Sequence, residues 1–128
     1  MNPGLTHGAD LTHQIIGLAM RVHSRLGPGL LESVYHRCLC HELSQAGIPF
    51  AQQVPLPIRY DDIELESGYH ADIIVNGEVI LELKPVERFS PLYEAQLLSY
   101  LRLSSRQIGL LINFNTVSLK DGIRRRVL

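Results

Sequence analysis

The spacing of the apolar residues changes several times along this chain of 128 residues. These residues recur every three to four positions over residues 11–26 and 30–46, as in amphipathic helices. From residue 49 to 84 they alternate or run together, and helical spacing returns over residues 90–103. A continuous apolar run over residues 107–113 is typical of a strand covered on both faces. The resulting order, α-α-β-β-β-α-β, predicts an α/β fold.

Turn-forming residues set the expected boundaries. Asp10 or Thr12 can cap the first helix, and a Gly-Pro-Gly break at 27–29 separates it from the second. Residues 54–60 read as one strand, and its two prolines place it at a sheet edge or leave one side unpaired. Further strands are expected over residues 68–75, 78–84 and 122–128.

Composition narrows the classes of function. Lys plus Arg is 12 against 13 for Asp plus Glu, so nucleic-acid binding would require a local basic patch. Residues 124–126 are three arginines, which could grip phosphates or simply be solvated. No basic and apolar leader or membrane-length apolar run is present, so we expect a cytoplasmic protein with no membrane partner. We expect a single domain over residues 1–128, with a flexible tail at residues 1–10.

The two cysteines, Cys38 and Cys40, lie two positions apart in an expected helix, where a disulfide between them is implausible. Neighbouring histidines have spacings that could contribute to a zinc or redox site. Zinc needs four ligands and no second cluster appears, so buried thiols are the expected structural alternative.

One strand combines Glu82 and Lys84 on the face opposite its apolar residues. Alone, Glu-x-Lys is usually a solvated strand face. The preceding strand, however, carries Asp72 among apolar neighbours, where a carboxylate is costly unless it is paired. Carboxylates on two adjacent strands with a lysine two residues on form the ligand set of a magnesium-dependent phosphodiesterase.

A site of this kind requires Asp72 and Glu82 to share a face of the sheet. A two-residue Asn76-Gly77 loop would send them to opposite faces. We therefore predict a three-residue turn over residues 75–77 with Gly77 left-handed, which pairs Asp72 with Ile80 and sets it diagonal to Glu82.

The sequence resembles the GxxExxY family, a group of small proteins in the PD-(D/E)XK superfamily, from about residue 15 to the C-terminus. The stretches that carry the resemblance are GLLESVY at 29–35, GYHAD at 68–72, ELKPVE at 82–87 and EAQLLSYL at 94–101. The resemblance implies a restriction-endonuclease-like core, with a central mixed sheet of four to five strands flanked by helices.

The resemblance also implies roles for particular residues. Asp72 and Glu82 would bind Mg²⁺, with Mn²⁺ as a substitute, helped by the main-chain carbonyl of Leu83. Lys84 would orient or deprotonate the attacking water. Glu32 would be a further ligand or water-holding acid, and Gln96 matches a helix-borne glutamine of these enzymes.

Three further residues lie in these motifs as possible edges of the site. Tyr35 and Tyr100 have the alternative of being core aromatics with hydrogen-bonded hydroxyls. His70 stands where arginine is expected in this family, which weakens any role of this position in phosphate binding.

The expected function is a Mg²⁺-dependent nuclease or phosphodiesterase that acts on nucleic acid, on DNA more than on RNA. The alternative is an inactive nuclease-fold module that binds or regulates nucleic acid or a nucleic-acid enzyme, in which Lys84 could pair with Glu82. Cutting a duplex would need two active sites, so a homodimer is a reasonable expectation.

Overall fold

The computed structural model describes residues 7–128, and the order of its elements follows the changes in apolar spacing. The elements are α1 (Gly8–Leu26), α2 (Glu32–Gln45), β1 (Phe50–Pro55), β2 (Ile58–Tyr60), β3 (Ile63–Leu65), β4 (His70–Val75), β5 (Val79–Leu83), α3 (Pro91–Ser104), β6 (Ile108–Ile112), the short 3₁₀ helix η1 (Leu119–Gly122) and β7 (Ile123–Val127). In the described part of the chain, no helix combines the length and the apolar composition needed to cross a bilayer.

Five strands form one mixed sheet in the order β1-β4-β5-β6-β7. Three of its four pairings are antiparallel, and only β5 and β6 run parallel. The connection between the two parallel strands contains α3, as expected for a crossover. Because β5 lies at the centre, its residues are buried on both faces and include Glu82.

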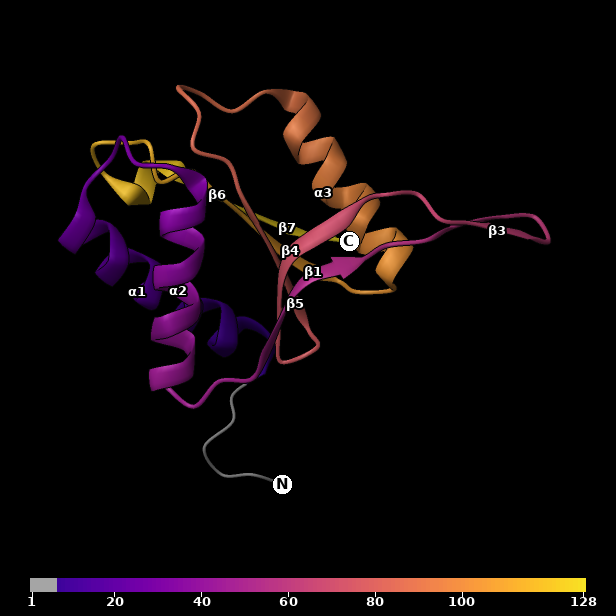
Figure 1. Ribbon diagram of the computed structural model, residues 1–128, viewed down its shortest axis with the longest axis horizontal. Coiled ribbons are helices and arrows are strands. Elements are labelled where there is room, and N and C mark those ends of the chain that lie inside the picture. The colour runs from indigo at the N-terminus through magenta and orange to yellow at the C-terminus, as the bar shows by residue number, and fades with distance from the viewer. Residues whose placement is uncertain (1–6) are drawn as a thin grey trace.

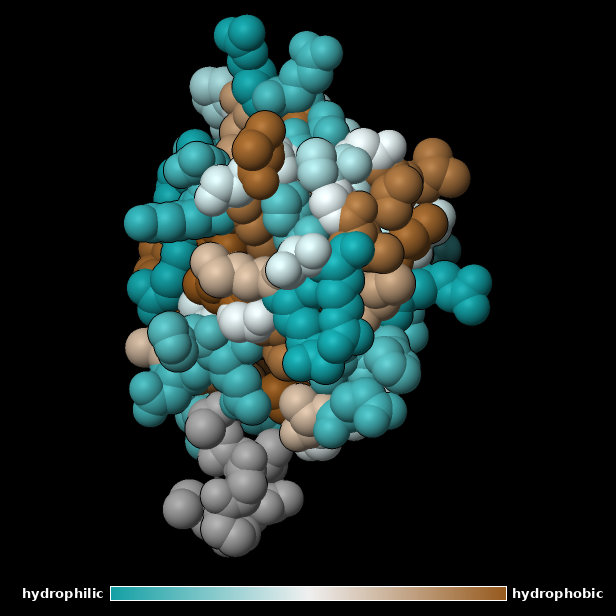
Figure 2. Space-filling view, turned by 90° about the vertical axis from the view of Figure 1, so that its left-hand side faces the viewer, coloured by the Kyte–Doolittle hydropathy of each residue, from teal (hydrophilic) through white to brown (hydrophobic). Residues whose placement is uncertain are grey.

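Helices cover both faces of this sheet (Figure 1). Helices α1 and α2 pack with Ile73, Leu81 and Leu110 in one apolar cluster. Helix α3 packs with Ile74 and Ile80 in another cluster on the opposite face. The side of the molecule shown in Figure 2 is mostly hydrophilic, with hydrophobic side chains in separate patches. The α/β class and the five-strand mixed sheet flanked by helices are therefore confirmed.

The first helix begins earlier than predicted. It starts at Gly8 behind an N-cap at His7 that makes no side-chain capping bond, so neither Asp10 nor Thr12 caps it. Glu78 of the β4–β5 turn instead accepts a hydrogen bond from the Gly8 N–H at 3.1 Å. Residues 8–10 of the tail predicted at residues 1–10 belong to α1, and residues 1–6 lie outside the described part.

The single strand predicted over residues 54–60 is wrong, because Leu56 and Pro57 interrupt it. Before them, β1 forms an edge of the main sheet, which confirms the edge position that the prolines predicted. After them, β2 pairs with β3 in a separate two-stranded hairpin. We call residues 58–65 the arm, which projects from the body in Figure 1.

The structure agrees with the alternative in which Cys38 and Cys40 are thiols within the fold rather than part of a zinc or redox site. Both thiols are free, and Cys40 is buried in the cluster under α1 and α2. Burial raises the pKa of the Cys40 thiol to about 11, which keeps it protonated and poorly reactive at neutral pH.

Candidate metal centre

The turn between β4 and β5 fixes how the two acidic residues face each other. Val75 pairs with Val79, so the turn contains Asn76, Gly77 and Glu78. Asn76 and Gly77 both have positive φ, of 50° and 66°. The turn has three residues and a left-handed Gly77 as predicted, but it lies one position further along the chain.

This shift changes the predicted register. Ile80 pairs with Ile74, so the predicted pairing of Asp72 with Ile80 is wrong. The last regular pair toward the open end of the hairpin is Ile73 with Leu81. One residue further along each strand, Asp72 and Glu82 occupy directly opposite positions, so the expectation that they share a face holds.

At this point the two carboxylates replace the regular strand pairing. The main-chain N–H of Asp72 donates to Oε2 of Glu82 at 2.7 Å. The main-chain N–H of Leu83 donates to Oδ2 of Asp72 at 2.8 Å. Each acid therefore accepts a hydrogen bond from the opposite strand, where the ladder between β4 and β5 ends.

Burial raises the pKa of both acids, and the charge of Asp72 raises that of Glu82 further. Glu82 is only 3% exposed. Burial and then the charge of Asp72 raise its pKa to about 8, although the Asp72 N–H and Lys84 oppose the shift. Burial also raises the pKa of Asp72, against the Leu83 N–H and the charges of Lys84 and His36. In the metal-free protein, burial therefore disfavours the charged form of both acids.

Lys84 is close enough to influence the pair without neutralising it by direct contact. Its charge lowers the pKa of both Asp72 and Glu82. Among residues 7–128, however, it takes part in no ion pair. Its Nζ lies instead over the ring of Tyr93, 5.5 Å from the centroid. The ammonium group is held by an aromatic surface rather than by a carboxylate.

The main chain around Lys84 is fixed by Asn113, a residue that the sequence analysis missed. Asn113 is 2% exposed. Its Nδ2 donates to the Val86 carbonyl at 2.6 Å, and its Oδ1 accepts from the Val86 N–H at 3.1 Å. The Lys84 N–H donates to the Ile112 carbonyl at 2.9 Å. A polar residue directly after the apolar run 108–112 was the available signal in the sequence.

Glu32 approaches the site from the first turn of α2. Burial and the charge of Asp72 raise its pKa, which places it within electrostatic range of the pair. Nearby, His36 is hydrogen-bonded through Nε2 to Oε1 of Gln52 at 2.9 Å. This contact ties α2 to the edge strand β1 beside the site.

The chain matches the family model of the PD-(D/E)XK nuclease superfamily over residues 9–126. The chain belongs to this superfamily. No curated protein and no solved structure matches it. The mixed sheet with helices on both faces is consistent with the restriction-endonuclease-like fold of the superfamily.

Helix α3 packs on the face of the sheet opposite α1 and α2, and it brings Tyr100 to the site. Tyr100 is buried. Burial, and then the charge of Glu82, raise the pKa of its hydroxyl, with smaller effects from Tyr69 and Asp72. Gln96 lies one turn earlier on α3 and lines the same surface hollow as Tyr100. These two residues therefore share a helix face beside the pair.

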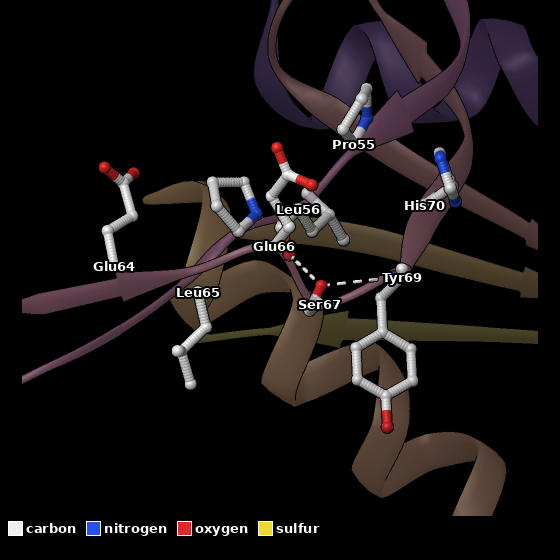
Figure 3. A pocket seen from close by; sticks show the side chains of 10 residues that line it. Pro55, Leu56, Glu64, Leu65, Glu66, Ser67, Tyr69 and His70 are labelled. Atoms are coloured by element: carbon white, nitrogen blue, oxygen red, sulfur yellow. Dashed lines mark hydrogen bonds between the residues drawn. The ribbon is translucent and has the colours of Figure 1, made fainter.

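Two other motif residues are placed elsewhere. Tyr35 is fully buried, and its hydroxyl donates to the Gly27 carbonyl at 2.7 Å and accepts from the Leu30 N–H at 3.0 Å. Its ring stacks on Phe114 with centroids 4.6 Å apart, as the core alternative required. His70 lies exposed at the start of β4 and lines a pocket at the base of the arm (Figure 3).

Two of the three arginines of β7 contact other parts of the fold. Arg126 Nη2 lies 2.8 Å from Glu94 Oε1 on α3, and Arg124 Nε lies 3.9 Å from the same oxygen. The guanidinium of Arg124 also covers the ring of Phe89 at 5.1 Å. These contacts fasten α3 to the edge of the sheet.

The donor set fits magnesium better than zinc. Within residues 7–128, no three His, Cys, Asp or Glu side chains are grouped so that they could hold one ion. Structural zinc needs four such ligands, whereas Mg²⁺ is commonly held by one or two carboxylates, with waters and substrate phosphates completing its shell. Asp72 and Glu82 match that requirement, and a divalent cation would compensate the burial that disfavours their charged forms.

Proposed function

We propose that this protein is a Mg²⁺-dependent nuclease or phosphodiesterase, with Mn²⁺ as a substitute metal. One observation carries the proposal: the buried Glu82 and the half-buried Asp72 lie opposite each other on adjacent strands, each accepts a main-chain N–H from the other strand, and burial raises the pKa of both. Proteins rarely bury such a pair without a compensating cation. In a nuclease-superfamily fold, the cation that suits hard oxygen donors is Mg²⁺.

Each residue of the site would have its own role in the reaction. Asp72 and Glu82 would bind the ion, and the carbonyl of Leu83, the last residue of β5, would be a third oxygen donor. Lys84 would hold the attacking water and stabilise negative charge as it develops. When bound, Mg²⁺ supplies Lewis-acid stabilisation of a phosphodiester and activation of water.

Glu32 and Gln96 would act from the two flanking helices. Glu32 is better placed to hold a water near Asp72 than to be a direct ligand, because the described residues offer no three-carboxylate group. Gln96 would contact the substrate from α3. Both roles place the nucleic acid at the end of the sheet where β4 and β5 separate.

The position of Lys84 favours the enzyme over an inactive binding module. In an inactive module, Lys84 could neutralise Glu82 by direct pairing. Within residues 7–128 Lys84 forms no ion pair and rests on Tyr93. An ammonium group that is not consumed by a carboxylate remains available to a water or a phosphate.

Membership of the GxxExxY group, a preference for DNA over RNA, a cytoplasmic location and a homodimer are parts of the same proposal. The motif at residues 29–35 supports the group, and the superfamily supports a nucleic-acid partner. Light scattering at micromolar protein concentration tests the homodimer.

Calorimetric titration with Mn²⁺ tests the metal centre directly. We expect the wild type to bind Mn²⁺, and we expect Asp72→Asn and Glu82→Gln to lose binding. Asp62→Asn is the matched control, because Asp62 is an exposed acid in the turn of the arm. A wild type that binds no Mn²⁺, or an Asp72→Asn variant that binds it equally well, contradicts the proposal.

A nuclease assay then tests the reaction. With Mg²⁺, the wild type should cleave DNA, and the variants that lose metal should not. Cleavage that persists in EDTA would contradict the proposed role of the metal.

A further inference from the structure

A hollow of about 580 Å³ runs along the outer side of α3, and we call it the α3 groove. Its volume is in the range of small-ligand sites, roughly 300–1,000 Å³. It is lined by Ile58 of the arm, by Tyr69, which precedes β4, and by Leu92, Gln96, Ser99, Tyr100, Arg102 and Leu103 of α3. Its lining therefore combines aliphatic side chains and aromatic rings with two neutral polar side chains and one cation.

Tyr100 connects the groove to the strands that carry the carboxylate pair. It lines the groove and packs in one cluster with Ile74 of β4 and Ile80 of β5. Its ring lies 6.0 Å from that of Tyr69, tilted by 48°. The groove therefore lies on the same face of the sheet as α3, against β4 and β5.

Tyr69 offers a ring to a ligand. It is 48% exposed, whereas Tyr100 is 6% exposed. The N–H of Tyr69 donates to Oγ of Ser67 at 3.1 Å, and the Ser67 hydroxyl donates to the Leu56 carbonyl, so the main chain beside the ring is fixed (Figure 3). An exposed aromatic ring on a fixed backbone is a stacking surface for a nucleobase.

Charge distinguishes the α3 groove from the pocket on the other side of Tyr69. That pocket is lined by Glu64 and Glu66 of the arm and its base, which would repel a phosphate chain. In Figure 3, the Tyr69 side chain points away from these two acids and toward α3. The charged residue that lines the α3 groove is Arg102, which is exposed and complements a phosphate.

We propose that the α3 groove binds one unpaired nucleobase of a nucleic-acid strand, stacked on Tyr69, with Gln96 and Ser99 at its polar edge and Arg102 on the backbone. Gln96 and Ser99 are three residues apart and share a helix face, so both can reach one base. A base within a duplex is stacked on both sides, so this site selects single-stranded or flipped nucleotides. The inference rests on the proposed function for the position of the cleaved phosphate, but not for binding.

Fluorescence anisotropy in EDTA tests binding without cleavage. The probes are fluorescein-labelled oligodeoxyuridylate and oligouridylate of about ten nucleotides, which differ only in the sugar, and a fully paired DNA of the same length. We expect Tyr69→Ala to weaken single-strand binding by about 5- to 100-fold, and Tyr69→Phe to retain it. The tighter of the two single strands identifies the sugar.

Two control variants keep this test specific. Tyr60→Ala removes an exposed tyrosine of the arm, outside the groove, and should leave affinity unchanged. Arg102→Gln should weaken binding of single strands and reduce its salt dependence, whereas Arg125→Gln on β7 should not. Equal losses in Tyr60→Ala and Tyr69→Ala, or duplex binding as tight as single-strand binding, would overturn the proposal.

The two proposals fail in different ways. Binding in EDTA that depends on Tyr69, without any metal-dependent cleavage, supports the base site and removes the nuclease. Cleavage that depends on Asp72 but is unchanged in Tyr69→Ala supports the nuclease and overturns the base site.

Discussion

The Glu82 carboxylate accepts a hydrogen bond from the main-chain N–H of Asp72, 2.7 Å away on the neighbouring strand. The Asp72 carboxylate in turn accepts the Leu83 N–H at 2.8 Å. The two acids therefore have a structural role in addition to the metal binding proposed for them. They accept hydrogen bonds from two main-chain N–H groups that would otherwise be unpaired at the point where β4 and β5 separate.

The stability of the metal-free protein should fall as the pH rises from about 4.5 to about 8. Burial and Asp72 raise the pKa of Glu82 from 4.5 to about 8 in the folded protein, so the folded state binds this proton more tightly than the unfolded state. The stabilisation is complete below the unfolded pKa and is lost as the pH passes through the folded one, a change of roughly 4 kcal/mol. Urea unfolding across this range in EDTA measures it.

Glu82→Gln isolates this effect. The neutral side chain keeps an oxygen for the Asp72 N–H but cannot ionise, so most of the pH dependence should disappear. Asp62→Asn, in an exposed turn, should keep the wild-type slope. Parallel pH profiles for the wild type and Glu82→Gln would contradict this account of Glu82.

Lys84→Met should separate catalysis from metal binding. Methionine retains the length of the side chain and its contact with Tyr93, but it removes the charge beside the attacking water. We expect DNA cleavage to fall by about 100-fold or more, while calorimetry still detects Mn²⁺ binding. Lys120→Met, which alters the other lysine of the chain on an exposed position, should cleave normally. Full activity in Lys84→Met would remove Lys84 from the mechanism.

Asn113→Ala should weaken both stability and catalysis, because Asn113 holds the main chain two residues after Lys84. The substitution removes the Asn113 side-chain partners of the Val86 carbonyl, the Val86 N–H and the Asn115 N–H, and the Val86 N–H keeps only its bond to the Lys84 carbonyl at 2.8 Å. We expect a loss of about 2–4 kcal/mol in the free energy of unfolding and a lower kcat. Urea unfolding and steady-state kinetics measure these changes.

Asn113→Asp provides a graded comparison for this prediction. It keeps an acceptor for the two N–H groups and loses only the donor to the Val86 carbonyl. It should therefore be more stable than Asn113→Ala. The reverse order would show that these hydrogen bonds do not stabilise the loop.

Substitution of alanine for Gly17 and for Gly122 should change the stability of the protein in opposite directions. At Gly17, inside α1, an added Cβ meets no atom within 4 Å, so alanine should stabilise the helix by about 0.5–1 kcal/mol. At Gly122 it would collide with the Asn113 carbonyl oxygen, which is main chain and cannot turn aside. Gly122→Ala should destabilise the protein by about 1–3 kcal/mol. Thermal unfolding of the two variants measures both signs.

The sequence predicted the common face of Asp72 and Glu82 because residue parity in a hairpin depends only on turn length. The register was predicted wrongly because it depends on where the turn begins. Val75 is fully buried and pairs with Val79, so burial keeps it in the strand and moves the turn onward to Glu78. The turn-forming residues Asn76 and Gly77 alone do not show whether Val75 or Glu78 is the third residue of the turn.

The arm and the Asn113 contacts were missed for a related reason. The alternation over residues 54–60 is regular, and nothing in it reveals that Pro57 separates two sheets. The contact of Asn113 with Val86, like that of His36 with Gln52, joins segments far apart in the chain. Periodicity predicts which residues are buried, but it does not predict which distant partner satisfies a polar side chain.

The hydrogen bonds that Asp72 and Glu82 accept also bear on how the chain could evolve. A descendant that no longer needed the reaction would still need an acceptor oxygen at both positions, from an acid or its amide, because losing it leaves a strand amide unpaired. Lys84 has no comparable duty to its neighbours, so its side chain could be lost at little cost to the fold. Among relatives of this protein, the presence of lysine at position 84 should therefore distinguish active from inactive proteins better than an acceptor oxygen at positions 72 and 82 does.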